Sequence, residues 1–327
     1  MGGEGFEPRY HPAGLDAQLR KPLEDVRAGR WKSMRDLLNS TLSHALRTSR
    51  SQVLAAAAAE GDAVEAWLQD EPCQPNAGMM LARVEVQRAL AAHGAGRRDA
   101  RELEARARAA CTDAARRWPA DPVPWIARLA LAQVDTVAWE HRQRHPREPI
   151  LPPGPWPLLH EAHRRDPCNR EAWHRMLQAL RALGEPTADF ARWVSSWAPT
   201  GSALTLLPLY VYAALYQEQR SRGAAALTFW TSDPVPYYTR RGLEHWFAHA
   251  DRTSWSVQDL NHLGQALCAG GFAEGAEVFR AIGECATPVP WQYSAVRPDR
   301  WREAFLAART HYLPDPSPGA QHARPRR

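Results

Sequence analysis

Residues 261–283 read NHLGQALCAGGFAEGAEVFRAIG, and the pattern in this stretch decides the fold. Apolar residues recur three or four positions apart on both sides of Gly270-Gly271, which is the spacing of the buried face of a helix. Each side also has one small residue within its apolar stripe, Gly264 before the double glycine and Gly275 after it. A position without a side chain lets two helices approach closely. The stretch therefore predicts two antiparallel helices joined by a glycine turn.

This pattern resembles the tetratricopeptide repeat, a helix–turn–helix unit of about 34 residues. The resemblance implies an all-α fold, a right-handed α-solenoid of irregular helical hairpins over residues 14–312. The first helices of such hairpins line a concave surface, so the resemblance also implies that the chain binds a protein or peptide partner without catalysing a reaction.

A second period supports helical repeats further upstream. Pro119 and Pro167 lie 48 residues apart, and so do Trp125 and Trp173. In repeats of this family a proline ends the second helix and a tryptophan lies near the start of the next one, so we expect both tryptophans to be buried between hairpins. The spacing exceeds the usual repeat by about 14 residues. Residues 144–157 are 14 residues long and contain six prolines, which predicts a polyproline-like insertion that loops out of the array.

The composition is that of a soluble protein with a mildly basic charge. The chain has 41 basic and 36 acidic residues and a net charge of +5, with no run of like charges that would indicate a nucleic-acid or membrane-binding tail. Only Lys21 and Lys32 are lysine, and this dominance of arginine indicates a GC-rich genome of the actinobacterial kind. The five cysteines show no Cys-x-x-Cys spacing, which favours a reducing cytoplasm.

The ends of the chain and its most apolar segment contain no targeting signal. Residues 1–13 are polar and lack an apolar core, so no signal peptide is predicted. No apolar stretch reaches the ~20 residues that a membrane span needs, so no membrane partner is expected. We expect residues 1–13 and the proline- and arginine-containing tail at 313–327 to be disordered.

Histidines at helical spacing leave a second class of function open. His245 and His249 lie four residues apart, as do His141 and His145, and Asp251 follows the first pair. On a helix this spacing places both imidazoles on one face, as metal sites require. The alternative is therefore an α-helical metalloenzyme with a His-lined cavity. The sequence contains no metal-protease, nucleophile-elbow or phosphate-loop motif, and we predict neither a cofactor nor a catalytic residue.

Paired arginines raise a third possibility, an RNA-binding helical repeat. Two of the pairs, Arg116-Arg117 and Arg164-Arg165, are 48 residues apart and fall at predicted helix ends. Basic residues there interact favourably with the negative end of the helix dipole. Nucleic-acid binding is therefore the less favoured explanation.

The resemblance also implies which side chains face the concave surface. Aligning the family's repeat with this chain at Trp173 and at Leu263 places polar side chains of two predicted first helices on that surface. Asn and Gln side chains could bind a peptide backbone, and Arg an acidic group. A paired tyrosine on a predicted loop is a further candidate. The predicted ligand-binding residues are Glu171, His174, Gln178, Arg181, Asn261, Gln265, Tyr237 and Tyr238.

Overall fold

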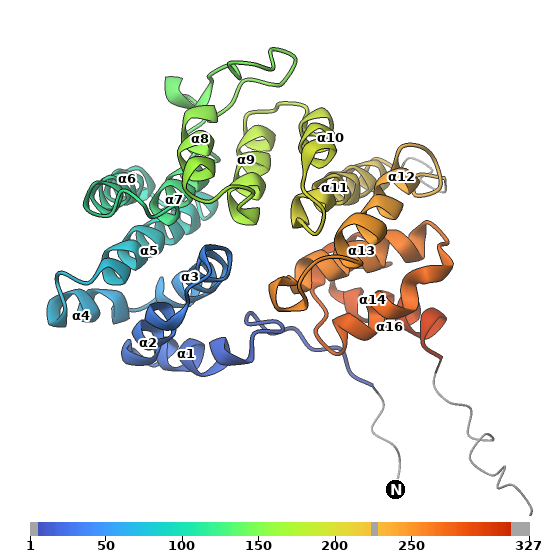
Figure 1. The fold of residues 1–327 in the computed structure, drawn as a ribbon, viewed down its shortest axis with the longest axis horizontal. Helices are drawn as coiled ribbons and strands as arrows, with labels where there is room; N and C mark the ends of the chain where they lie inside the picture. Colours follow the sequence, from blue (N-terminus) through green and yellow to red (C-terminus); the bar gives the residue numbers. More distant parts are fainter. Residues whose placement is uncertain (1–5, 224–227, 315–327) are drawn as a thin grey trace, which may run out of the picture. The chain divides into compact units, whose positions relative to one another are not determined.

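The computed structural model describes residues 6–223 and 228–314. Every regular element in these residues is a helix, which confirms the all-α class (Figure 1). The single domain predicted over residues 14–312 is divided into two compact units. The first unit contains residues 16–207, and the second contains the segment before residue 16 together with residues from 208 onward.

The first unit contains ten α-helices and two short 3₁₀ turns within its described residues. They are α1 (Ala17–Arg27), α2 (Lys32–Ser40), α3 (His44–Ala58), α4 (Ala63–Asp70), α5 (Pro75–Gly94), α6 (Ala100–Arg117), α7 (Val123–Leu131), η1 (Trp139–His141), α8 (Trp156–Arg165), α9 (Arg170–Ala182), α10 (Thr187–Trp197) and η2 (Ala203–Leu206).

Three helices of the first unit end in the same way. The residues that follow α4, α6 and α8 are Glu71, Trp118 and Asp166, respectively. Their φ/ψ angles are −134/71°, −130/76° and −141/87°. Each precedes a proline, and the proline ring excludes the α-helical conformation from the residue before it. Each also donates its N–H to the carbonyl four residues earlier. The proline period in the sequence is therefore a repeated helix ending.

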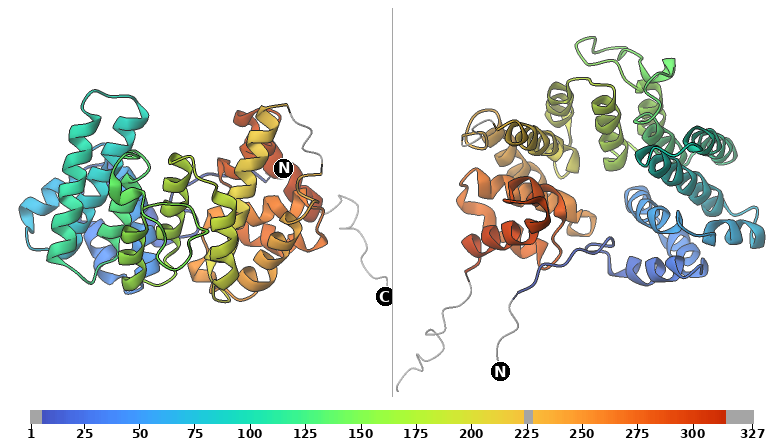
Figure 2. Two further views of the ribbon diagram at one scale, coloured as in Figure 1. Left: turned by 90° about the horizontal axis from the view of Figure 1, so that it is seen from above. Right: turned by 180° about the vertical axis from the view of Figure 1, so that it is seen from behind.

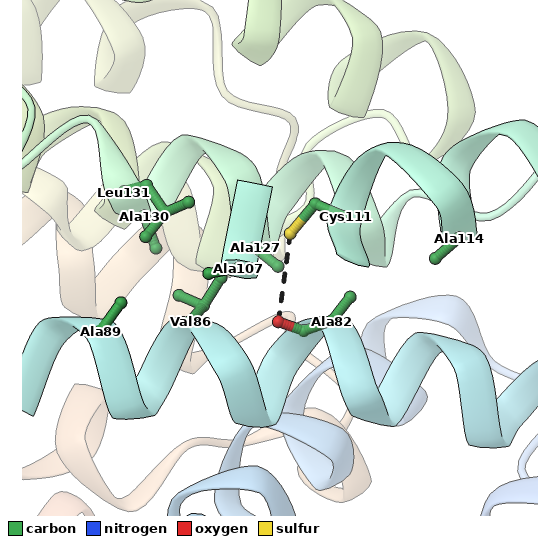
Figure 3. Packing of buried hydrophobic residues seen from close by; sticks show 9 residues of the cluster. All are labelled: Ala82, Val86, Ala89, Ala107, Cys111, Ala114, Ala127, Ala130 and Leu131. Atoms are coloured by element: carbon green, nitrogen blue, oxygen red, sulfur yellow. Dashed lines mark hydrogen bonds between the residues drawn. The ribbon is translucent and has the colours of Figure 1, made fainter. Parts of the chain in front are cut away.

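One part of the core of the first unit is packed with small side chains. α5 and α6 lie side by side as a hairpin (Figure 2), and the cluster between α5, α6 and α7 consists mainly of alanines (Figure 3). The Cys111 thiol lies 4.0 Å from the Ala82 carbonyl oxygen. Burial raises the pKa of this thiol to about 12, so it stays protonated and is not a nucleophile.

The predicted insertion is a loop, but it packs against the helices. It runs from residue 142 to 155, between η1 and α8, and Gln143 and Gly154 pair their backbones at 3.0 and 2.8 Å. A Cβ at Gly154 would lie 2.7 Å from Met176 Cε, which shows how closely the loop approaches α9. The predicted boundary at 157 is wrong, because Trp156 and Pro157 form the first turn of α8, where proline is favoured.

The second unit contains six α-helices and four short helical turns within its described residues. They are α11 (Leu207–Ser221), α12 (Val235–Arg241), η3 (Gly242–Phe247), η4 (Arg252–Ser254), α13 (Val257–Ala269), η5 (Ala273–Gly275), α14 (Ala276–Ile282), α15 (Pro288–Ser294), η6 (Pro298–Arg300) and α16 (Trp301–Tyr312).

Residues 261–283 form the predicted helix–turn–helix. α13 ends at the double glycine, where Gly271 has a φ of +68°, and η5 and α14 follow. A Cβ at Gly264 would lie 3.2 Å from Ile282 of α14, so this glycine permits the close approach of the two helices. Gly275 does something else, because a Cβ there would lie 2.5 Å from the ring of Tyr312 on α16.

The prediction of a disordered N-terminus is wrong for residues 6–13. Arg9 donates its N–H to the Glu284 carbonyl at 2.7 Å and accepts from the Ala286 N–H at 3.1 Å. The Phe6 ring lies 6.4 Å from that of Phe305, on α16. These contacts hold the segment against the helices of the second unit. The remaining predictions of disorder, at residues 1–5 and 315–327, lie outside the described residues.

Candidate functional site

The prediction that Glu171 faces a binding surface is wrong. Its side chain is buried on α9, where it accepts hydrogen bonds from Arg83 Nη1 and Nη2 at 3.0 and 2.7 Å and from Arg175 Nε at 3.2 Å. Burial acts to raise the pKa of Glu171, but the two guanidinium groups outweigh it and hold the pKa below its usual value. Glu171 is therefore a charged part of the core that joins α5 to α9.

The other candidates on α9 differ in their exposure. His174 is half-buried, and Gln178 and Arg181 are exposed. The Gln178 Oε1 atom accepts a hydrogen bond from Arg175 at 3.0 Å. Only Gln178 and Arg181 of this predicted set are thus accessible to a partner.

Asn261 and Gln265 on α13 are buried, so their predicted role in a groove is wrong. Asn261 Oδ1 accepts from Trp291 Nε1 at 2.7 Å, and Nδ2 donates to the Val257 and Cys285 carbonyls at 2.7 and 3.2 Å. Gln265 Nε2 donates to the Ser294 hydroxyl at 3.0 Å. Both amides join α13 to the segment around α15, because a buried polar group has to be hydrogen-bonded.

The tyrosine pair lies on a helix and not on a loop. Tyr237 and Tyr238 belong to α12, where Pro234 and Val235 start the helix. Their rings meet edge to face at 4.9 Å, and Tyr237 is 58% exposed. The prolines that predicted a loop here mark a helix start, a position that proline favours.

The structure does not bring together the predicted metal ligands. His245 lies in η3, a π-helical turn, and His249 follows it. His249 lies in the turn after η3, so the two histidines do not share one regular helix. Asp251 Oδ1 accepts from the Thr253 N–H at 2.9 Å, and this bond lowers the pKa of Asp251. Residues 6–223 and 228–314 contain no group of three or more His, Cys, Asp or Glu side chains that could hold a metal ion.

The paired arginines at the helix ends are bound to neighbouring acids. Arg116 and Arg117 both contact Asp113 on α6, each at 2.8 Å. Arg164 and Arg165 contact Glu161 on α8 at 2.8 and 2.5 Å. These contacts support the helix-end explanation over phosphate binding.

The sequence analysis missed an open groove along the outer face of α6, with a volume of about 840 Å³. One side is formed by Ala105, Ala109 and Thr112, whose spacing places them on a single helical face. The same face continues to Arg101 at one end and Arg116 at the other. The opposite side is the turn at residues 134–137, after α7.

The acidic side chains that line the groove are neutralised by arginines. Arg108 Nη2 lies 2.6 Å from Asp135 and 2.9 Å from Glu104. Burial acts to lower the pKa of Arg108, but its hydrogen bonds to the two carboxylates outweigh burial and hold the pKa above its usual value. The ion pairs therefore persist at neutral pH. Arg101 is exposed and forms no ion pair or hydrogen bond within the described part of the chain. The three arginines that line the groove (Arg101, Arg108 and Arg116) match its three carboxylates (Glu104, Asp113 and Asp135) in number, and Arg101 is the one of them left without a carboxylate partner among the described residues.

One exposed apolar side chain lines the groove, and a second lies two residues further along the chain. Val137 lines it and is 83% exposed, and Trp139, on η1, is 80% exposed. Sequence alone offers a weak signal for this surface: small residues at helical spacing on α6, followed by Val137 and Trp139 in a polar stretch. The same pattern is compatible with a buried face, so only the structure identifies it.

The described residues contain no helix that combines the length and the apolar character needed to cross a membrane. Comparison with protein-family models, with curated proteins and with solved structures finds no significant match to this chain.

Proposed function

We propose that this chain is a non-catalytic binding protein that holds an acidic segment of a partner protein in the α6 groove. The groove is the single observation that carries the proposal. Its small side chains leave room for a peptide against α6. Its own carboxylates are paired, and Arg101 remains available for a carboxylate of the partner.

The flanking side chains favour a polypeptide over a small molecule. Val137 and Trp139 present apolar area beside the groove, and an exposed tryptophan is typical of the centre of protein interfaces. A peptide that filled the groove and covered both side chains would gain apolar burial and charge complementarity together. A small metabolite confined to the groove would leave Trp139 in water.

We further propose that the hairpins form a tetratricopeptide-like solenoid acting in a reducing cytoplasm. The repeated helix endings before proline support the first part of this proposal, and the five free thiols support the second. The binding surface differs from the one predicted by the resemblance, because Glu171, Asn261 and Gln265 are buried.

Selection of random peptides displayed on phage against the full chain tests the proposal. We expect the selected peptides to contain Asp or Glu next to apolar residues. Their affinity, measured by fluorescence anisotropy, should fall by about tenfold or more, or roughly 1.4 kcal/mol, in Ala109→Trp, which fills the groove. Arg101→Glu should weaken binding and reduce its dependence on salt.

Matched variants separate the groove from general effects. Ala91→Trp places the same bulk at an exposed position of α5, and Arg20→Glu makes the same charge change on α1. Both should bind the peptides as the original chain does. Peptides that bind Ala109→Trp and Ala91→Trp equally well would refute the groove as the binding site.

A further inference from the structure

One histidine of the insertion at residues 142–155 contacts two helices at once. The ring of His145 lies edge to face on Trp156 of α8, with centroids 4.6 Å apart. It meets Trp193 of α10 at 5.6 Å and His160 of α8 at 5.5 Å. His145 is therefore the residue through which the loop contacts two helices.

The hydrogen bonds of His145 fix its protonation state. Its Nδ1 atom accepts from the Glu148 N–H at 2.9 Å and from the Arg147 N–H at 3.3 Å. An acceptor at Nδ1 requires the neutral ring with its proton on Nε2. A second proton would have to bind Nδ1, where two backbone N–H groups already point at it.

The surroundings also disfavour a charged ring. His160 is the titratable group that faces it from α8, and the Arg147 guanidinium lies near it on the loop itself. The Glu148 carboxylate acts in the opposite direction, because a negative charge nearby favours the protonated ring and raises the pKa of His145. From α10 it meets the uncharged ring of Trp193, and the neighbouring Arg192 and Asp189 pair with each other at 3.4 Å.

We propose that protonation of His145 releases the insertion from α8 and α10 as the pH falls. The proton comes from solvent and binds Nδ1, which breaks both backbone hydrogen bonds. It also places a positive charge beside His160 in a partly buried site. The loop would then leave while α8 keeps its own hydrogen bonds.

The direction of the effect follows from linkage. Burial, then the neighbouring His160, lowers the pKa of His145 below its usual value in the docked loop. A group with a lowered pKa stabilises the docked state above its ordinary pKa, and that stabilisation is lost as the pH falls through this range. The stabilisation of the docked loop is therefore fully present above about pH 6.5, the ordinary pKa of histidine, and falls below it.

Hydrogen–deuterium exchange of the full chain at pH 7.5 and pH 5.0 tests the proposal. Exchange rates of peptides covering 142–155 are divided by the intrinsic rate at each pH, with peptides from α5 and α6 as internal references. We expect protection of the Gln143, Gly154 and Leu151 amides, which are hydrogen-bonded in the docked loop, to fall severalfold at pH 5.0. Protection in α5 and α6 should not change.

Two variants give the controls. His145→Asn keeps an acceptor near the Nδ1 position but does not titrate, so it should abolish the pH dependence. His44→Asn removes an exposed histidine of the same unit and should leave the dependence intact. If His145→Asn instead exposes the loop at both pH values, the His145 imidazole titration, followed by NMR in the original chain, decides. Loop opening that does not follow that titration overturns the proposal, as does unchanged protection at pH 5.0.

Discussion

The α6–α7 and α8–α9 hairpins have the same joint but first helices of different length. Trp118 and Asp166 lie 48 residues apart and leave their helices with nearly the same φ and ψ before proline. Yet α6 has 18 residues and α8 has 10. The positions that correspond to the first two turns of α6 lie in the insertion. A proline thus fixes where a helix ends, while the residues upstream decide where it begins.

The difference in length changes what the outer face of the helix does. Thr112 of α6 lines an open groove. The residue 48 positions later is His160 of α8, which meets His145 of the insertion. The same repeat position therefore contributes to a candidate binding surface in one hairpin and to the attachment of a loop in the next.

The inner faces differ most at the second residue of α9, and this gives the largest expected effect. Glu171 pairs with Arg83 in the core, whereas the corresponding residue of α7 is Val123, which is fully buried. Glu171→Val leaves the Arg83 charge buried without its main partner. We expect it to lower the free energy of unfolding by about 3–5 kcal/mol, measured by urea denaturation.

The double variant separates the charge from the packing. Replacing a buried ion pair by apolar residues of similar volume is often neutral. Arg83→Met combined with Glu171→Val should therefore recover most of the stability lost in the single variant. An unchanged urea midpoint for Glu171→Val alone would show that the ion pair is not part of the core.

Trp125 and Trp173 give a second, smaller contrast. Trp173 is buried and packs on Phe190 and Trp197, with ring centroids 6.1 and 5.1 Å away. Trp125 is half-buried and is covered by the Arg165 guanidinium at 4.8 Å. Trp173→Ala should cost about 3–5 kcal/mol, and Trp125→Ala about 1–2 kcal/mol, because less of its surface leaves water. Equal losses of stability in the two variants would contradict this difference in burial.

The tryptophans show how far the sequence could predict the fold. Spacing placed both of them correctly near the start of a helix, because proline and helical periodicity act locally. It could not predict that only one would be fully buried, since burial depends on the helices that pack around it. The expectation that both are buried is right for Trp173 and only partly right for Trp125.

The buried candidates, Glu171, Asn261 and Gln265, were predicted wrongly for the same physical reason. A polar residue on a helix can face water or satisfy a buried partner, and the two cases have the same local pattern. Asn261 accepts a hydrogen bond from Trp291, which is 30 residues away in the sequence, and Glu171 accepts one from Arg83, which is 88 residues away. The α6 groove could not be predicted either, because it is formed by α6 and a turn that follows another helix.

The ion clusters at the ends of α6 and α8 give the smallest effect. Asp113 and Glu161 are 48 residues apart, and hydrogen bonds from Arg116 and Arg165, respectively, are the main cause that lowers the pKa of each carboxyl. Arg116→Gln and Arg165→Gln should each raise the pKa of their carboxyl towards its usual value. NMR titration of the carboxyl carbons measures both changes.

The stability of the two variants should nevertheless differ. The Arg116 side chain is 75% exposed, so its loss should change the free energy of unfolding by less than about 0.5 kcal/mol. Arg165 is only 9% exposed, stacks on Trp125 and donates to the Pro119 carbonyl at 2.5 Å. Arg165→Gln therefore removes a contact between α8 and α7, which should cost about 0.5–1 kcal/mol more. The same charge pattern would then be a surface feature in one hairpin and a packing contact in the next. Equal stabilities of the two variants would contradict that distinction.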